Sequence, residues 1–247
     1  MVEKYFSTKL GRLYLGDALE FLRGLPDESV DLVLTDPPYN ISHDTVITRE
    51  GGKFGKAKPI SMDFGEWDKG QVKWQHYVPE FARVLRRGGV LVMFYDRLYI
   101  GIIGLYLQNR YGFRVRHIGA AVKNNPTPQA RKVKWMIGTE LFLVATKGSG
   151  HHFNWQLGQS PDYYIHSVSF KPRYHPTQKH LGLIEWIMKY WSFEGDLVVD
   201  PFIGSGTTAV AAERLGRRWL GCDNNREYLD MAVKRLRPFK SQTKLEV

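Results

Sequence analysis

Short apolar runs alternate with amphipathic segments along most of the chain. A continuous apolar pattern, typical of a strand buried on both faces of a sheet, covers residues 30–35, and further strand-like segments cover residues 89–95, 113–122, 140–146, 196–200 and 218–223. Helical spacing of apolar positions, or a helix-favouring composition, covers residues 18–24, 72–87, 98–110, 181–191, 207–216 and 225–236. Strands that alternate with helices predict an α/β fold built on a doubly wound, mostly parallel sheet.

Two departures from this alternation modify the prediction. Residues 140–146 follow the strand at 113–122 with no helix between them, which predicts one antiparallel strand at an edge of the sheet. Residues 42–66 are rich in Gly, Lys and Ser without a sustained period, which predicts a long mobile loop, and residues 147–178 are expected to be irregular. The whole chain, residues 1–247, is expected to form one domain with insertions.

Charge and cysteine content narrow the class of protein. The net charge is +10, and residues 114–134 carry six Lys and Arg but no acid, a clustering that suits a polyanion such as DNA or RNA. Cys222 is the only cysteine, which excludes an intrachain disulfide and a cysteine zinc site. No apolar run is long enough to span a bilayer, and the first residues lack the pattern of a signal peptide. A cytoplasmic protein is therefore expected.

A glycine-rich turn joins the strand at 196–200 to the helix at 207–216. Gly204 and Gly206 allow backbone amides to approach a ligand closely, and the helix that follows offers its positive end. Asp223 ends the next strand, where an acid can accept both hydroxyl hydrogens of a ribose.

Three interpretations of this turn compete. It can be a tight turn that binds nothing. It also satisfies the dinucleotide pattern G-x-G-x-x-G/A through Gly204, Gly206 and Ala209. The third interpretation is a site for an adenosyl cofactor without a pyrophosphate. Residues 201–203 separate the strand from the first glycine and widen the turn, and an aromatic among them suits a nucleoside or sulfonium, so the third is favoured.

A second polar element, D-P-P-Y at 36–39, follows the strand at 30–35 directly. Open α/β sheets bind ligands at such strand ends. Pro37 and Pro38 can simply make a rigid turn on which Tyr39 packs. The chemical interpretation is that Asp36 and the Pro37 carbonyl accept hydrogen bonds from an exocyclic amine while Tyr39 stacks on the ring that carries it. The sequence thus predicts a socket for an amino-bearing planar base.

D-P-P-Y (36–39) together with D-P-F-I-G-S-G-T-T (200–208) resembles the amino-methyltransferases, which methylate exocyclic amines of DNA bases with S-adenosylmethionine. The catalytic motif precedes the cofactor motif, which is similar to the circularly permuted order of the β group. D-F-G-E-W-D (63–68), K-N-N-P-T-P (123–128) and H-P-T-Q-K (175–179) resemble its adenine-N6 members from type II restriction–modification systems. The resemblance implies the Rossmann-like fold of S-adenosylmethionine-dependent methyltransferases.

The resemblance also assigns residues to the cofactor site. It implies a pocket for the methionine and adenosine parts of S-adenosylmethionine, lined by Asp36, Asp200, Phe202, Gly204, Ser205, Gly206, Thr207 and Thr208. Asp223 would hold the ribose and Asp17 the adenine amine. Thr177 and Lys179 would meet the methionine end, although their segment can equally be a simple cap for the helix at 181–191.

By this resemblance the chain is expected to methylate the N6 amine of an adenine flipped out of double-stranded DNA. The spelling D-P-P-Y, rather than S-P-P-Y, favours adenine over cytosine. Methylation of cytosine N4 or of RNA adenine stays open within the same class. A nicotinamide-dependent oxidoreductase and a catalytically silent, DNA-binding methylase subunit are the alternatives from other classes.

The expected DNA contacts lie within residues 123–178, the predicted target-recognition region. Candidate phosphate contacts are Lys123, Arg131, Lys132 and Lys134, which can also form a solvated basic face. Asn124 and Asn125 can read base edges, although Asn-Asn-Pro is equally a turn signal. His151, His152 and His166 have no partners at metal spacing, so no metal is expected. Besides DNA, the resemblance suggests a second copy of the chain and a cognate restriction endonuclease as partners, and no membrane.

Overall fold

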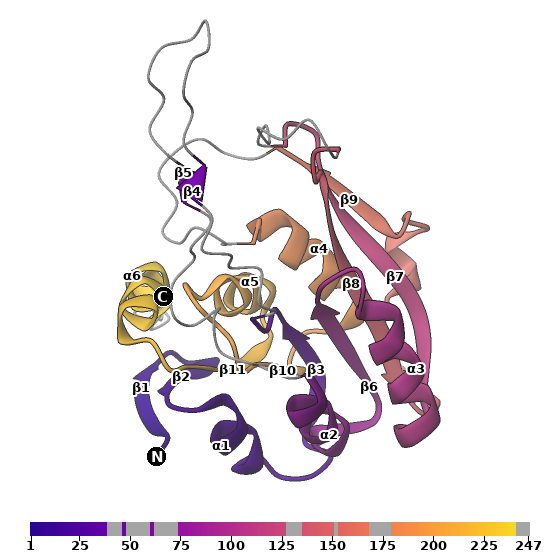
Figure 1. Cartoon of the computed structure of the whole chain (residues 1–247). Coiled ribbons are helices and arrows are strands. Elements are labelled where there is room, and N and C mark those ends of the chain that lie inside the picture. Colours follow the sequence, from indigo (N-terminus) through magenta and orange to yellow (C-terminus); the bar gives the residue numbers. More distant parts are fainter. Residues whose placement is uncertain are drawn as a thin grey trace, which may run out of the picture.

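The computed structural model describes residues 1–38, 46–47, 60–61, 74–126, 135–150, 153–167 and 179–240. A twisted sheet with helices on both faces forms the body of the molecule (Figure 1). The strands of this sheet are β1 (Glu3–Ser7), β2 (Gly11–Leu15), β3 (Val30–Thr35), β6 (Leu85–Phe94), β7 (Phe113–Lys123), β8 (Thr139–Lys147), β9 (Tyr163–His166), β10 (Leu197–Asp200) and β11 (Arg218–Asp223). Two short strands, β4 (Val46–Ile47) and β5 (Ile60–Ser61), pair separately with each other.

The helices form two layers, one on each face of the sheet (Figure 1). One layer contains α1 (Ala18–Arg23), α2 (Trp74–Val84) and α3 (Ile100–Tyr111), and the other contains α4 (Leu181–Trp191), α5 (Thr207–Leu215) and α6 (Arg226–Lys240). Alternate residues of β3 serve the two cores: Val33 packs with the first layer, and Leu32 and Leu34 pack with the second. Side chains of a strand alternate between the faces of a sheet, so a continuous apolar run marks a strand covered on both sides.

The strand order β1-β2-β11-β10-β3-β6-β8-β7-β9 puts β3 beside β10 at the centre. These two strands are parallel, with Val198 opposite Leu32 and Val199 opposite Val33. From β3 the chain continues through α2 to β6, whereas from β10 it continues through α5 to β11 on the other side. The polar segments that follow the two strands therefore open at adjacent strand ends, at the switch point of the sheet.

The mostly parallel, doubly wound sheet is confirmed, but its antiparallel strand does not lie at the edge. β8 lies between β6 and β7 and runs antiparallel to both, and β9 extends the sheet beyond β7. β1 is a second antiparallel strand, paired with β2 at the opposite edge. Neither β1 nor β9 has the continuous apolar pattern that reveals a central strand.

The helix predicted over 72–87 ends earlier than expected. α2 stops at Val84, and Leu85 already pairs with Val30 in the sheet. The register of β6 against β3 shifts between this pair and the pair Leu32–Val90, which marks a bulge. Gly88 lies in that bulge with a φ of 80°. Gly88 and Gly89 therefore lie inside a strand, where Gly88 allows the bulge, and do not end a helix.

Two further predictions need adjustment. Residues 147–178 were expected to be irregular, yet β9 forms there and pairs in parallel with β7, Ala120 lying opposite Tyr163. The last helix continues to Lys240 rather than ending near residue 236. No described helix is both long and apolar enough to cross a membrane.

Candidate active site

Asp200 links the two central strands to the helix that follows the glycine turn. The hydroxyl of Thr35, at the end of β3, donates to Asp200 Oδ1 at 2.8 Å, and the hydroxyl of Thr208, in the first turn of α5, donates to Oδ2 at 2.7 Å. The Phe202 N–H also donates to Oδ1 at 3.1 Å. The Asp200 side chain is buried, and burial raises its pKa to about 7. Asp200 thus holds the ends of β3 and β10 together.

Replacing Asp200 with asparagine is expected to change how stability depends on pH. Burial raises the pKa of this carboxyl from 3.8 to about 7 in the folded protein, so the stability that protonation contributes is complete below 3.8 and is lost as the pH rises through about 7. The wild type should therefore lose stability relative to Asp200→Asn over this range, by at most about 1.4 kcal/mol per pH unit. Urea unfolding of both proteins near the two ends of the range measures the difference. Equal changes in the two proteins would contradict the assignment.

The glycine turn is held by Asp223. The Gly204 N–H donates to Asp223 Oδ2 at 2.9 Å, and the Asn225 N–H donates to Oδ1 at 2.9 Å. Burial raises the pKa of the Asp223 carboxyl. Gly204 has a φ of 50°, and no heavy atom of the residues that the structure describes, its chain neighbours aside, lies within 4 Å of where a Cβ would stand, whereas a Cβ on Gly206 would lie 2.8 Å from Ala232 of α6. Gly204 therefore borders open space, and Gly206 is required for helix packing.

The hydroxyl residues of the turn face the protein interior. Arg235 of α6 donates from Nη1 to the Ser205 carbonyl at 2.6 Å, to the Ser205 hydroxyl at 3.2 Å and to the Thr207 hydroxyl at 3.1 Å. Ser205, Thr207 and Thr208 are all buried. Their predicted contact with a cofactor is untested, and the observed role of their side chains is to fix the turn against α6 and β10.

Asp17 lies beside Asp223 at the neighbouring strand end. The Gly16 N–H donates to the Asp223 carbonyl at 3.1 Å, and the Asp17 carboxylate caps α1 through the amides of Leu19 and Glu20, both at 2.9 Å. The ring of Phe202 packs edge-on against Tyr77 of α2, with 5.0 Å between centroids. Burial, followed by the charge of Asp17, raises the pKa of Tyr77. The structure therefore gathers Asp17, Phe202 and Asp223 in one place.

A chain of charges begins at Asp36, directly after β3. Asp36 Oδ2 lies 2.5 Å from Lys179 Nζ, and the same ammonium lies 3.2 Å from Glu140 Oε2 at the start of β8. The other oxygen of Glu140 pairs with Lys123 at the end of β7. Lys179 Nζ also lies 4.9 Å from the centroid of the Phe94 ring. The aspartate of D-P-P-Y and the lysine of H-P-T-Q-K are thus direct neighbours.

With this geometry in place, comparison with known proteins identifies the family. The family described as DNA methylase (N6_N4_Mtase) matches residues 30–234 of this chain. The chain belongs to this family. S-adenosylmethionine is accordingly its methyl donor.

Individual relatives can be aligned with this methyltransferase over nearly its whole length. It is 33% identical to the type II methyltransferase M2.DpnII of Streptococcus pneumoniae, over 96% of this chain and 93% of that protein. It is 31% identical to M2.LlaDCHI of Lactococcus lactis subsp. cremoris, with the same coverage. These relatives support a type II DNA methyltransferase of the β class.

Solved structures share the fold. The M1.HpyAVI–SAM complex superposes with a TM-score of 0.71 at 27% identity, covering 92% of this chain and 98% of that one. The cytosine-N4-specific PvuII DNA methyltransferase superposes with a TM-score of 0.73 at 22% identity, covering 93% and 87%, and it shows the fold alone.

The described residues of the methyltransferase suit S-adenosylmethionine. The space next to Gly204 is not filled by any neighbour, and a Cβ there would occupy it. The Asp223 carboxylate accepts a hydrogen bond from the Gly204 N–H of the turn. Gly206 is the N-cap of α5, and no side chain caps this helix end. An adenosyl group needs such an acid for its ribose and such backbone amides beside it.

Several predicted residues lie outside the part of the chain that the structure describes. Tyr39, Thr177, Arg131, Lys132 and Lys134 belong to this group, and so do His151, His152 and most of the predicted loop at 42–66. Their roles stay predictions. Among the residues that the structure does cover, no group of three His, Cys, Asp or Glu could hold a metal ion.

Cys222 has the inert role expected of a small buried hydrophobe. It is fully buried in β11, its thiol lies 3.4 Å from the Gly16 carbonyl, and burial raises its pKa to about 12. A thiol with so high a pKa is not a nucleophile at neutral pH.

Four residues join the site although the sequence did not single them out: Thr35, Tyr77, Phe94 and Glu140. Thr35 directly precedes D-P-P-Y, and Glu140 is an acid at the start of an otherwise apolar strand, so both carried a usable signal. Tyr77 and Phe94 are buried like ordinary core residues, and nothing local distinguishes them.

Proposed function

We propose that this methyltransferase methylates the exocyclic N6 amine of an adenine that is flipped out of double-stranded DNA. S-adenosylmethionine, when bound, supplies an electrophilic methyl group. Asp17, Lys179, Asp223 and the backbone of the turn at Gly204 would hold it, and residues 36–39 would hold the target base.

One observation supports this proposal above all others. Asp36 follows β3, and the glycine turn follows β10, and these two strands are paired neighbours. The proposed amine socket and the proposed methyl donor site therefore lie side by side, at the carboxyl ends of two adjacent parallel strands. Holding two reactants in such a geometry replaces a bimolecular encounter, which can contribute roughly 7–11 kcal/mol to catalysis.

The chemistry of the amine explains why a carboxylate is needed there. The lone pair of adenine N6 is delocalised into the ring, so the nitrogen is a weak nucleophile. A hydrogen bond donated by the amine to Asp36, and a second to the Pro37 carbonyl, would localise the lone pair and orient it. The amine loses a proton on methylation, either to Asp36 or to water. The motif sequence D-P-P-Y, rather than S-P-P-Y, supports adenine over cytosine as the substrate base.

The expected DNA face lies where β7 and β9 end and β8 begins. Asn124 is exposed, and its N–H donates to the His166 carbonyl at 3.1 Å, which fixes it to the end of β9. The N–H of Lys123 donates to the Gly138 carbonyl at 2.7 Å. Trp135, on the same segment as Gly138, is 95% exposed. An exposed aromatic beside fixed amides suits stacking on bases and contacts to their edges. The chain of charges connects this face to Asp36.

Replacing Lys132 with glutamine is expected to flatten the salt dependence of DNA binding. If Lys132 neutralises one phosphate, the slope of log K against log salt concentration should fall by about one. Fluorescence anisotropy with labelled duplex DNA at several salt concentrations measures the slope. Lys234→Gln, an exposed change on α6, is the control that should leave it unaltered. The same slope for wild type and Lys132→Gln would remove Lys132 from the phosphate contacts.

Incubation with S-adenosylmethionine that carries a radiolabelled methyl group tests the proposed substrate polymer. The proposal expects label to enter unmethylated duplex DNA and not RNA. Label in RNA would support the RNA adenine alternative. A protein that binds cofactor and DNA but transfers no label would be the silent subunit. The expected dimer, the cognate endonuclease and the cytoplasmic location stay predictions.

A further inference from the structure

Glu140 stands between the target-recognition end of β7 and the reacting end of β3. Each of its carboxylate oxygens is paired with a different ammonium group: Oε1 with Lys123, and Oε2 with Lys179 at 3.2 Å. Lys179 in turn lies 2.5 Å from Asp36. Glu140 is therefore one ion pair away from the carboxylate that we assign to the substrate amine.

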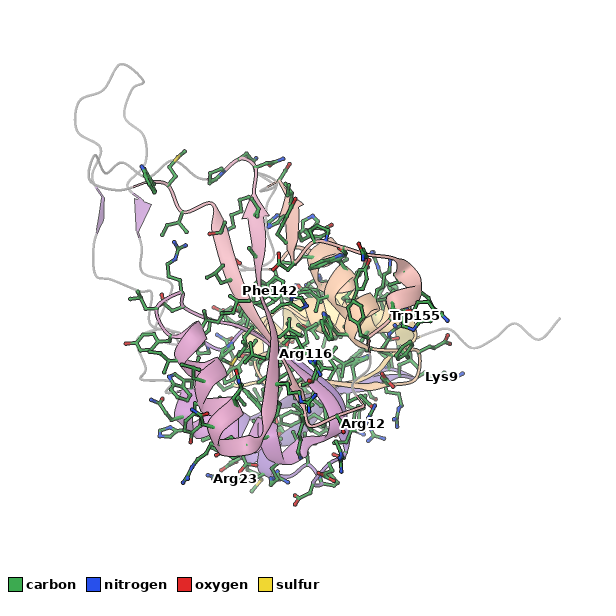
Figure 2. The ribbon with its side chains drawn as sticks, turned by 90° about the vertical axis from the view of Figure 1, so that its right-hand side faces the viewer. Lys9, Arg12, Arg23, Arg116, Phe142 and Trp155 are labelled. Atoms are coloured by element: carbon green, nitrogen blue, oxygen red, sulfur yellow. The ribbon has the colours of Figure 1, made fainter. Side chains whose placement is uncertain are left out.

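The surroundings restrict Lys179 to this arrangement. Its side chain is only 12% exposed, and its ammonium lies over the Phe94 ring at 4.9 Å. Phe94 packs against Phe142, with 5.3 Å between ring centroids (Figure 2 labels Phe142 on the β7–β8 hairpin). Phe142 is two residues beyond Glu140 on the same strand, so one segment of β8 pairs with Lys179 through Glu140 and packs, through Phe142, against the Phe94 ring that Lys179 contacts.

The two carboxylates, of Asp36 and Glu140, are matched by the two ammonium groups of Lys123 and Lys179. The two ammonium groups, Lys179 first, hold the pKa of Glu140 at about 2, so its carboxylate stays ionised at neutral pH. Without Glu140, Lys179 would keep its ion pair with Asp36 but would lose the carboxylate on its other side. The Lys179 ammonium would then be free to turn fully onto Asp36 and to occupy the oxygens that must accept the substrate amine. Removing one member of a partly buried charge group forces such a rearrangement.

We propose that Glu140 is a positioning residue for methyl transfer: it divides the Lys179 ammonium between two carboxylates and so keeps Asp36 oriented and available to the substrate amine. The inference rests on the proposed function of Asp36. Glu140 itself touches neither substrate nor cofactor in this account. Its pairing with Lys123 links the same carboxylate to the strand that leads into the expected DNA face.

The test compares Glu140→Gln with wild type in a DNA methylation assay. We expect kcat to fall about 10- to 100-fold, because small misplacements of a catalytic group have effects of this size. The Kd for S-adenosylmethionine should change less than kcat, because Asp17, Asp223 and the turn at Gly204 would still hold the cofactor, and the KM for DNA should also change less than kcat. Glu80→Gln is the matched control, since Glu80 also pairs with a cation, Arg83 at 2.8 Å, but on α2 away from the site. It should keep the wild-type kcat.

A second variant separates positioning from folding. The double variant Glu140→Gln with Lys123→Gln restores charge balance, so it should recover the thermal midpoint of wild type without recovering kcat. The inference is overturned if Glu140→Gln keeps kcat within twofold of wild type, or if the double variant recovers kcat together with stability. If the wild type itself methylates no DNA, the proposed function fails instead, which is a distinguishable outcome.

Discussion

Asp36→Ala is expected to abolish methyl transfer while S-adenosylmethionine still binds. The alanine removes the carboxylate that would accept the hydrogen bond from the substrate amine, and groups of this kind contribute about 10²- to 10⁴-fold to rate. Lys179 loses its neighbour at 2.5 Å but keeps Glu140 at 3.2 Å, so the cofactor side of the site should survive. Single-turnover methylation, together with calorimetric titration of the cofactor, measures both quantities.

Asp36→Asn is the companion variant. Asparagine keeps one acceptor oxygen but turns an amide donor towards Lys179 and the substrate, so an activity between wild type and alanine is expected. Asp27→Asn, which alters an exposed ion pair with Arg83, is the control for general effects of removing a carboxylate. Retention of wild-type kcat by Asp36→Ala would refute the role assigned to Asp36.

Asp223→Ala is expected to weaken cofactor binding by about 10²-fold or more, because each hydrogen bond to a charged group contributes roughly 1.5–3 kcal/mol. The carboxylate is expected to accept the ribose hydroxyls, and it also fixes the glycine turn through the Gly204 N–H at 2.9 Å. Equilibrium dialysis with labelled S-adenosylmethionine measures the affinity.

A cofactor analogue separates these two contributions of Asp223. Wild type should bind S-adenosylhomocysteine more tightly than its 2′,3′-dideoxy form, whereas Asp223→Ala should bind both alike. If the variant discriminates between the two ligands as strongly as wild type does, Asp223 does not contact the ribose. In that case its role is limited to holding the turn.

The central part of the fold was predictable because its signals are local. A strand buried on both faces shows a continuous apolar run, and β3, β10 and β11 all have one. Each of the two motifs that follow β3 and β10 is a short contiguous stretch. Their adjacency followed from the rule that ligands bind where neighbouring strand ends diverge.

The edges of the sheet were not predictable in the same way. β9 has only four residues, of which Tyr163 and Ile165 are exposed, so no buried pattern distinguishes it from a loop. Its pairing with β7 depends on chain that is distant in sequence. The early end of α2 has a similar cause, because Leu85 joins the sheet opposite Val30 instead of adding a turn to the helix.

Within the site, the sequence did not predict the contacts of side chains whose partners come from distant segments of the chain. The motif alone suggested that Ser205 and Thr207 face a ligand, yet Arg235, from a helix that comes later in the chain, binds both hydroxyls. The role of Glu140 can be recognised only in the fold, where Lys123 and Lys179 from two other segments pair with its carboxylate. Sequence motifs thus predict candidate reacting groups, and packing determines which neighbours hold them.

The identity of the methylated base tests the central claim most directly. Duplex DNA that lacks methylation would be treated with the wild-type protein and S-adenosylmethionine, digested to nucleosides and analysed by mass spectrometry beside authentic standards. The account predicts N6-methyladenine in the wild-type sample and none with Asp36→Ala. N4-methylcytosine in the wild-type sample, or N6-methyladenine formed equally well by Asp36→Ala, would contradict it.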